Sequence, residues 1–150
     1  MSESLFEEVL NSRGSCNVPQ LWNIICSHST DLKAHNLVLG IPGSGDTILY
    51  QHIISRNFQP FVRRSEIISY PPNGNKLLKR AIITGIAVID TKRNGQGGEA
   101  VIEGGGVGAA FVDIKLISEV FKGFSFMVLI VGKYFDQLLE VNEKLQNFEK

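Results

Sequence analysis

One ten-residue stretch, AIITGIAVID at positions 81–90, decides the fold class of this 150-residue chain. Apolar residues fill almost every position of it, and β-branched residues are abundant, which favours an extended strand. The two faces expected from the two-residue period of a strand are Ile82, Thr84, Ile86 and Val88, and Ile83, Ala87 and Ile89. Because both faces are apolar, the stretch predicts a buried central strand.

The sequence around this stretch alternates with the same period of two. Further strands are expected over residues 46–54, 99–103, 111–117 and 124–131, and residues 61–70 are expected to be an interrupted extended region. In the first of these we expect Ile48, Tyr50, His52 and Ile54 on one face. Fourteen of the 15 glycines lie between Gly40 and Gly132, where they supply turns between the strands. Short strands at close spacing, with no helical crossover between them, predict an antiparallel sandwich or barrel.

Both ends of the chain lack this glycine pattern and have a helical period instead. Residues 5–10 and 18–25 form two short amphipathic stretches, and Leu138, Val141, Leu145 and Phe148 continue a helical pattern near the C-terminus. The predicted fold is therefore mainly β, with short N-terminal helices and a C-terminal helix. We expect an N-terminal helical extension and linker over 1–36, an all-β domain over 37–133, and an amphipathic helix over 134–150.

Composition narrows the class of protein. The formal net charge is zero, so the composition gives no sign of the strongly basic surface typical of nucleic-acid binding. The longest apolar run, residues 126–131, is far too short to cross a bilayer, and the acidic start is unlike a signal peptide. We expect a soluble intracellular chain without membrane association. His28, His35, His52 and the two cysteines do not follow metal-ligand spacing, so no metal site is expected.

Two glycine-rich segments look like nucleotide sites at first sight. Residues 40–47, GIPGSGDT, match a phosphate-binding loop except that Asp46 replaces its lysine, and a strand pattern follows where that loop needs a helix. Residues 104–109, GGGVGA, fit part of a dinucleotide fingerprint but also precede a strand pattern. The first is therefore predicted to be a turn at a strand entrance, and the second a connection between strands. With no catalytic set of residues in the sequence, neither enzyme activity nor a cofactor is predicted.

The terminal helical segments carry apolar residues at the spacing i, i+3, i+4. Such residues can dock a helix in the groove of a partner, and they can equally pack against the chain's own sheet. The candidate partner-binding residues are Leu21, Ile24 and Ile25 near the N-terminus and Phe135, Leu138 and Leu139 near the C-terminus.

Read in order, several segments of the β domain resemble one known family. They are Leu39-Gly40, Gly45-Asp46-Thr47-Ile48-Leu49-Tyr50, Ile67-Ile68-Ser69-Tyr70-Pro71, residues 82–90, residues 97–100, residues 104–108 and residues 124–132. In order and spacing they resemble the insect multiprotein bridging factor type-two family of transcription activators. The similarity covers about two-thirds of the chain, by the count of residues 37–133.

The resemblance implies a function that composition alone does not. It implies a non-enzymatic transcriptional coactivator in the nucleus, which works with a smaller bridging factor on a DNA-bound nuclear receptor and engages general transcription factor IIA. It does not imply direct sequence-specific DNA binding. Because many members of the family carry signal peptides, the alternative is a soluble β protein, cytoplasmic or secreted, that holds a small apolar ligand between its strands.

Overall fold

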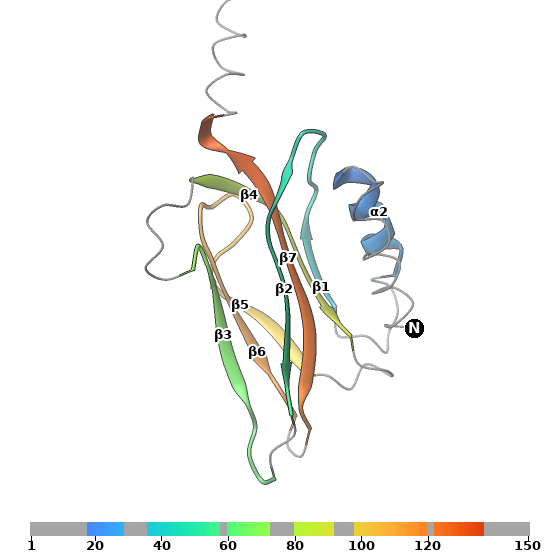
Figure 1. Ribbon diagram of the computed structural model, residues 1–150, viewed down its shortest axis with the longest axis vertical. Coiled ribbons are helices and arrows are strands. Elements are labelled where there is room, and N and C mark those ends of the chain that lie inside the picture. The colour runs from blue at the N-terminus through green and yellow to red at the C-terminus, as the bar shows by residue number, and fades with distance from the viewer. Residues whose placement is uncertain are drawn as a thin grey trace, which may run out of the picture.

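In the computed structural model of this chain, residues 18–28, 36–57, 60–72, 80–91, 98–119 and 122–136 are described. They form one helix and seven strands (Figure 1). The elements are α2 (Val18–His28), β1 (Leu37–Gly40), β2 (Thr47–Arg56), β3 (Ser65–Tyr70), β4 (Ala81–Asp90), β5 (Glu99–Gly105), β6 (Val112–Ile117) and β7 (Phe124–Tyr134).

The strands form two antiparallel sheets that face each other. One sheet has the order β1-β4-β7-β2 and the other β3-β6-β5. Apolar side chains from both sheets fill the space between them, including Ile83, Ile114, Phe124, Phe126 and Ile130, all without exposed surface. The prediction of a mainly β, antiparallel fold is therefore confirmed. Between the two predicted forms, the described strands make a sandwich of two sheets and not a closed barrel.

The helix α2 covers the outer face of the four-stranded sheet, away from the three-stranded sheet (Figure 1). Its buried residues Leu21, Trp22 and Ile25 pack against a second apolar cluster from β4 and β7. The shared members of that cluster are Ala87, Ile89, Met127, Leu129 and Val131. The second predicted N-terminal helix is thus confirmed over 18–28, as one layer of a three-layer arrangement.

Some predictions fall on residues outside the described ranges. The first predicted helix, near residues 5–10, lies there, and so does almost all of the predicted C-terminal helix over 134–150. The division of the chain into 1–36, 37–133 and 134–150 stays a prediction.

Two bulges change the predicted faces of the strands. In β4, Ile83 pairs with Gly132 but Gly85 pairs with Val131, so the chain has one extra residue at Thr84. In β2, Ile48 pairs with Val131 but Tyr50 pairs with Ile130, which leaves an extra residue at Leu49. Each extra residue reverses the alternation of side chains on one side of the bulge.

The assignment of faces from strict alternation was therefore wrong in part. Ile83 lies between the sheets together with Ile86 and Val88, whereas Ala87 and Ile89 face α2. Likewise Ile48 packs in the cluster under α2, and Tyr50 and Ile54 pack between the sheets. The β2 bulge lies opposite Ile130 and Val131 of β7, and the β4 bulge lies opposite Val131 and Gly132, so the two irregularities meet at Val131 from the two sides of β7.

The interrupted extended region predicted over 61–70 contains one strand. That strand, β3, begins only at Ser65. Residues 60–64 belong to the connection between β2 and β3 instead.

Candidate functional site

The glycine loop at residues 40–47 connects two strands. The strand β1 ends at Gly40 and β2 begins at Thr47, so the segment after the loop is a strand and not a helix. A helix N-terminus is what would have placed backbone amides around a phosphate. The prediction of a turn at the entrance of a strand is confirmed.

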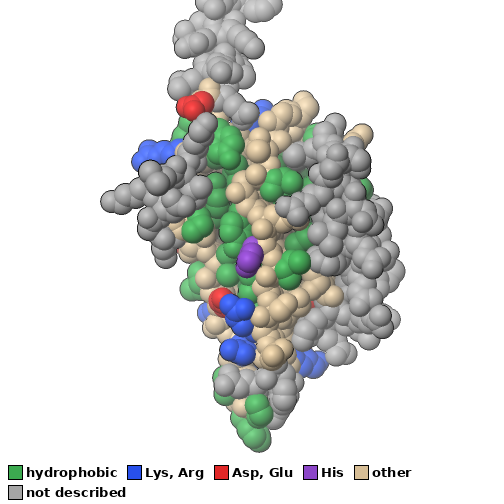
Figure 2. Space-filling model, viewed as in Figure 1, with side chains coloured by type: hydrophobic (Ala, Val, Ile, Leu, Met, Phe, Trp, Pro, Cys, Tyr) green, Lys and Arg blue, Asp and Glu red, His purple; other side chains and the backbone are tan. Residues whose placement is uncertain are grey.

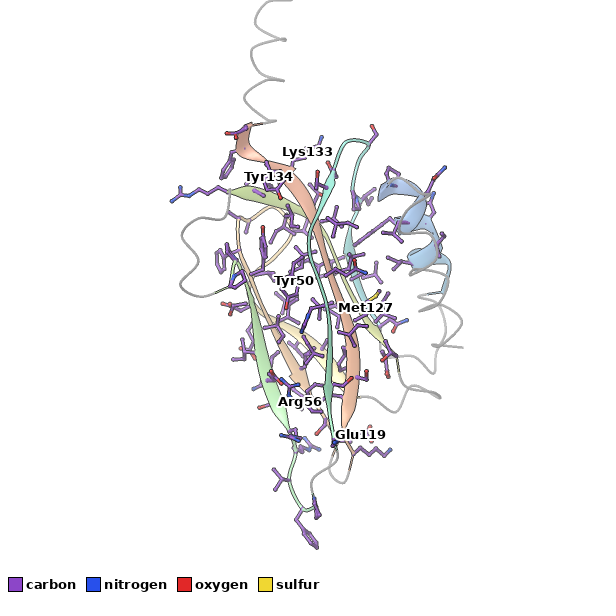
Figure 3. The ribbon with its side chains drawn as sticks, viewed as in Figure 1. Tyr50, Arg56, Glu119, Met127, Lys133 and Tyr134 are labelled. Atoms are coloured by element: carbon purple, nitrogen blue, oxygen red, sulfur yellow. The ribbon has the colours of Figure 1, made fainter. Side chains whose placement is uncertain are left out.

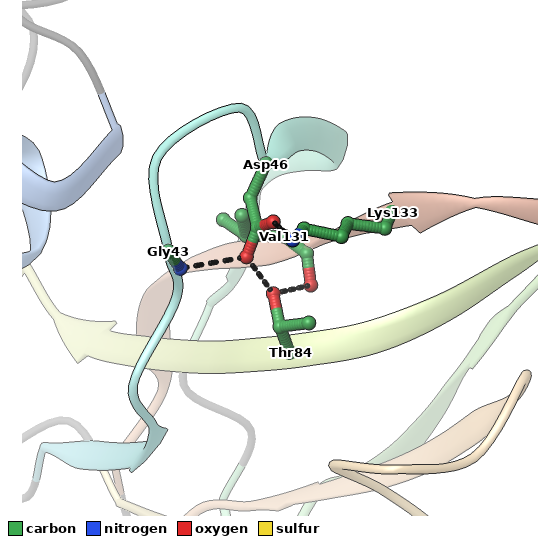
Figure 4. A network of polar contacts seen from close by, with 5 residues as sticks. All are labelled: Gly43, Asp46, Thr84, Val131 and Lys133. Atoms are coloured by element: carbon green, nitrogen blue, oxygen red, sulfur yellow. Dashed lines mark hydrogen bonds and ion pairs between the residues drawn. The ribbon is translucent and has the colours of Figure 1, made fainter. Parts of the chain in front are cut away.

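Asp46 is the centre of a polar network in this loop (Figure 4). Its Oδ2 accepts hydrogen bonds from the Gly43 N–H at 2.8 Å and the Thr84 hydroxyl at 2.7 Å. Its Oδ1 lies 3.6 Å from the Lys133 ammonium, and this carboxylate is almost completely buried. Since Thr84 is the extra residue of the β4 bulge, Asp46 joins the loop to the bulge and to β7. The residue that departs from the phosphate-loop pattern thus stabilises the fold.

Replacing Asp46 by alanine should therefore lower the free energy of unfolding by about 2–3 kcal/mol, because two hydrogen bonds to a buried carboxylate are lost. Denaturant unfolding followed by circular dichroism measures the change. The control is Glu103→Ala, which removes an exposed carboxylate 3.9 Å from Lys115. An exposed ion pair of this kind contributes at most about 1 kcal/mol. Equal losses for the two variants would show that Asp46 does not join these elements.

The second glycine segment connects β5 to β6. After β5 ends at Gly105, the Gly106 N–H donates to the Phe111 carbonyl at 3.0 Å, and β6 begins at Val112. The Gly108 N–H also donates to the Ile83 carbonyl at 2.8 Å, which ties this turn to the opposite sheet. The predicted strand connection is confirmed.

Aromatic side chains line the edge where β2 faces β3. The ring of Tyr50 lies 6.2 Å from those of both His52 and Tyr70. Burial raises the pKa of Tyr50 above its ordinary value, and the nearby Glu66 carboxylate raises it further. Burial also raises the pKa of Tyr70, with a second contribution from Tyr134. Both phenols are therefore neutral at physiological pH and contribute to packing between the sheets rather than acting as anions.

An ion pair closes the same edge. Arg56 on β2 and Glu66 on β3 lie 2.5 Å apart and connect the two sheets. Figure 3 shows Tyr134, Tyr50 and Arg56 following one another along the long axis of the molecule. No single residue type in the sequence marks this edge, because which side chains of β2 and β3 face one another depends on how the two sheets pack.

A cavity of about 510 Å³ opens at the end of the sandwich where Glu119 lies (Figure 3). Its lining combines apolar and charged residues, namely Asn36, Leu37, Arg63, Gly98, Glu99, Ala100, Ile117, Ser118 and Glu119. Since β1 and β5 are the edge strands of their sheets, the cavity lies at a margin of the sandwich. It is therefore a mixed polar opening, and not the apolar interior that the small-ligand alternative predicts.

Among the residues that the structure describes, no group of three or more His, Cys, Asp or Glu side chains is placed to hold a metal ion. In the same part of the chain, no helix has the length and apolar character needed to cross a membrane.

The predicted partner-binding residues have different surroundings. Leu21 and Ile25 are buried on the face of α2 that packs against the sheet, and Ile24 is half-buried against the same cluster. Phe135 is half-buried at the end of β7, where its N–H donates to the Arg80 carbonyl at 3.0 Å. Leu138 and Leu139 lie outside the described residues. The structure thus brings the three N-terminal residues together and assigns two of them to internal packing.

Comparison with known proteins identifies the family. The sequence matches the family described as Transcription activator MBF2 over residues 39–132, which is more than half of the chain and almost all of the sandwich. No curated protein and no solved structure gives a significant match. The family description names a transcription activator, which indicates a role in transcription. This chain belongs to the Transcription activator MBF2 family.

Proposed function

We propose that this chain is a non-enzymatic transcriptional coactivator in the nucleus. It bridges a DNA-bound regulator, reached through a smaller bridging factor, to general transcription factor IIA. The observation that carries the proposal is the family match, which spans the two-sheet scaffold from β1 into β7. The description of the family as a transcription activator supports activation, and the partners are part of the proposal.

The architecture is suited to a function through contact. The two sheets have a filled interior, and the glycine loops that resembled nucleotide sites are occupied by structural hydrogen bonds. Such a scaffold holds its outer loops and edges in fixed positions, which lowers the entropic cost of binding a partner.

The terminal helical residues remain candidates for partner contacts within this proposal. Leu21 and Ile25 could reach a partner only if α2 left the sheet, because both are buried against it. Ile24 and Phe135 are half-buried and retain exposed surface. Leu138 and Leu139 complete the set at the C-terminus.

A reporter assay tests the proposed function. With the DNA-bound regulator present, the chain and the bridging factor together should raise reporter expression by about fivefold or more, and neither should do so alone, as coupled binding requires. The double variant Leu138→Ala with Leu139→Ala examines the C-terminal contacts in the same assay.

The location of the chain in the cell is measured alongside the reporter assay. A tagged full-length chain should be found in nuclei. Activation that does not depend on the bridging factor, or a chain recovered only from the medium, would contradict the proposal.

A further inference from the structure

The connection between β2 and β3 exposes two neighbouring apolar side chains at the tip of the molecule. Phe61 is 84% exposed and Val62 is 47% exposed. Figure 2 shows hydrophobic side chains at the lower extremity, below Lys and Arg side chains, and Figure 1 shows the β2–β3 connection at that end. Contact with water makes these apolar side chains unfavourable in free energy. A partner that buried both side chains would remove their surface from water and gain this free energy on binding.

The base of this loop is held in place by hydrogen bonds. The Arg64 N–H donates to the Ser118 hydroxyl, and the Ser118 N–H donates to the Arg64 carbonyl, both at 2.8 Å. The Arg64 guanidinium also donates to the Asn57 carbonyl at 3.1 Å, which links the two sides of the loop. The loop therefore presents Phe61 from a fixed base, and fixing an interface group before binding reduces the entropy that binding costs.

The backbone of Phe61 is in an unusual conformation. Its φ is 62°, and it is the one described residue other than glycine with a positive φ. Bulky side chains seldom adopt this region, in which asparagine and aspartate are several-fold enriched. A strained residue whose side chain contributes little to the core is thus kept at the tip, as is common at binding sites.

The charges of the β2–β3 connection indicate which kind of partner surface would bind it. Residues 57–65 contain Arg63 and Arg64 and no acidic residue. Arg63 is exposed beside Val62. A partner surface bordered by carboxylates would complement these arginines and would attract the loop over a distance of about 10 Å at moderate salt.

We propose that Phe61 and Val62 form a docking knob for a protein partner that presents an apolar pocket bordered by carboxylates. The proposal rests on the proposed function, of which it names the contact surface. Aromatic residues and arginine are both enriched at protein interfaces, and a few such residues usually contribute most of the binding energy. Two apolar side chains with two arginines form only a weak membrane anchor, which favours a protein over a lipid surface.

The variant Phe61→Asn removes the knob and suits the positive φ. Its affinity for one of two probes, purified bridging factor or purified general transcription factor IIA, should fall by about 30-fold or more, as expected for a hot spot. Its melting temperature should equal or exceed that of the unchanged chain, because asparagine tolerates this backbone conformation better than phenylalanine. Loss of binding without loss of stability is the signature that a structural role would not give.

The matched control is Ile41→Asn. Ile41 is 92% exposed in the β1–β2 loop, where no arginine is adjacent, and its replacement should leave both affinities within about twofold. Unchanged affinity of Phe61→Asn, while the unchanged chain binds, would overturn the knob alone. If the unchanged chain bound neither probe, the proposed function and the knob would both be rejected.

Two other occupants are tested with the same variants. Sedimentation velocity detects a dimer that Phe61→Asn abolishes, and flotation with vesicles of phosphatidylcholine and phosphatidylserine detects attachment to a lipid surface. A Phe61-dependent result in either measurement, without Phe61-dependent binding to a protein probe, would overturn the proposal.

Discussion

Replacing Gly40 by alanine should lower the free energy of unfolding by about 3 kcal/mol, which is at the severe end of single substitutions. Gly40 has a φ of 86°, a conformation that alanine adopts at a cost. A Cβ at this position would lie 2.2 Å from the Thr84 carbonyl oxygen, a backbone atom of β4 that cannot rotate away. Alanine at position 40 should therefore separate β1 from β4. Urea unfolding monitored by tryptophan fluorescence measures the loss.

The same loop contains the control for this substitution. A Cβ at Gly43 would have nothing within 4 Å, and its φ lies outside the left-handed region. Gly43→Ala should change the free energy of unfolding by no more than about 0.5 kcal/mol. If Gly43→Ala were as destabilising as Gly40→Ala, the requirement for glycine would belong to the loop as a whole and not to its close approach to β4.

Replacing Trp22 by alanine should lower the free energy of unfolding by about 3–4 kcal/mol, in the range found for large buried aromatic residues. Trp22 lies on the face of α2 that packs against the sheet and is 4% exposed. Its Nε1–H donates to the Gly40 carbonyl at 3.0 Å. A Cβ at Gly85 would come within 2.9 Å of the Trp22 ring, which shows how closely the helix approaches the sheet. The variant therefore removes apolar contact and a hydrogen bond from the joint between helix and sheet.

The neighbouring exposed residue is the control for Trp22. Asn23→Ala lies on the solvent side of α2 and should leave the free energy of unfolding within about 0.5 kcal/mol. Chemical unfolding followed by circular dichroism compares the two variants, because this signal does not depend on the tryptophan. A cost below about 1 kcal/mol for Trp22→Ala would show that α2 is a dispensable attachment and not a layer of the fold.

The strands could be predicted because their apolar residues follow a short local period. Residues 81–90 were predicted as a strand and form β4 with the same bounds, since ten consecutive residues carry the signal. The bulges at Leu49 and Thr84 could not be predicted, because an extra residue is defined only by the pairing with β7. A local pattern contains no information on that pairing, which is why the faces of Ile48 and Ile83 were wrong.

The polar network of Asp46 was only half visible in the sequence. Asp46 could be recognised as a residue that does not suit a phosphate loop. Its partner Thr84 lies 38 residues away, and Lys133 is still farther along the chain. Contacts at such separation depend on the topology of the sheet, so a single sequence could not predict what the carboxylate binds.

Phe61 was missed because its neighbours resemble a strand. The residues Phe61-Val62 before Arg63-Arg64 continue an apolar pattern toward β3, and the prediction of an interrupted extended region from 61 to 70 included them. Pro60 was the available signal, because proline favours turns. Only the structure shows that β3 begins at Ser65 and that the two apolar side chains lie outside both sheets.

The claim that this chain works by joining other proteins is tested most directly by reconstitution. The purified chain, the bridging factor and general transcription factor IIA are mixed, and the masses of the species are measured by light scattering after size exclusion. We expect one species with the summed mass of all three proteins, which disappears when the chain is left out. Elution of the chain alone, or assembly of the other two without it, would contradict the claim.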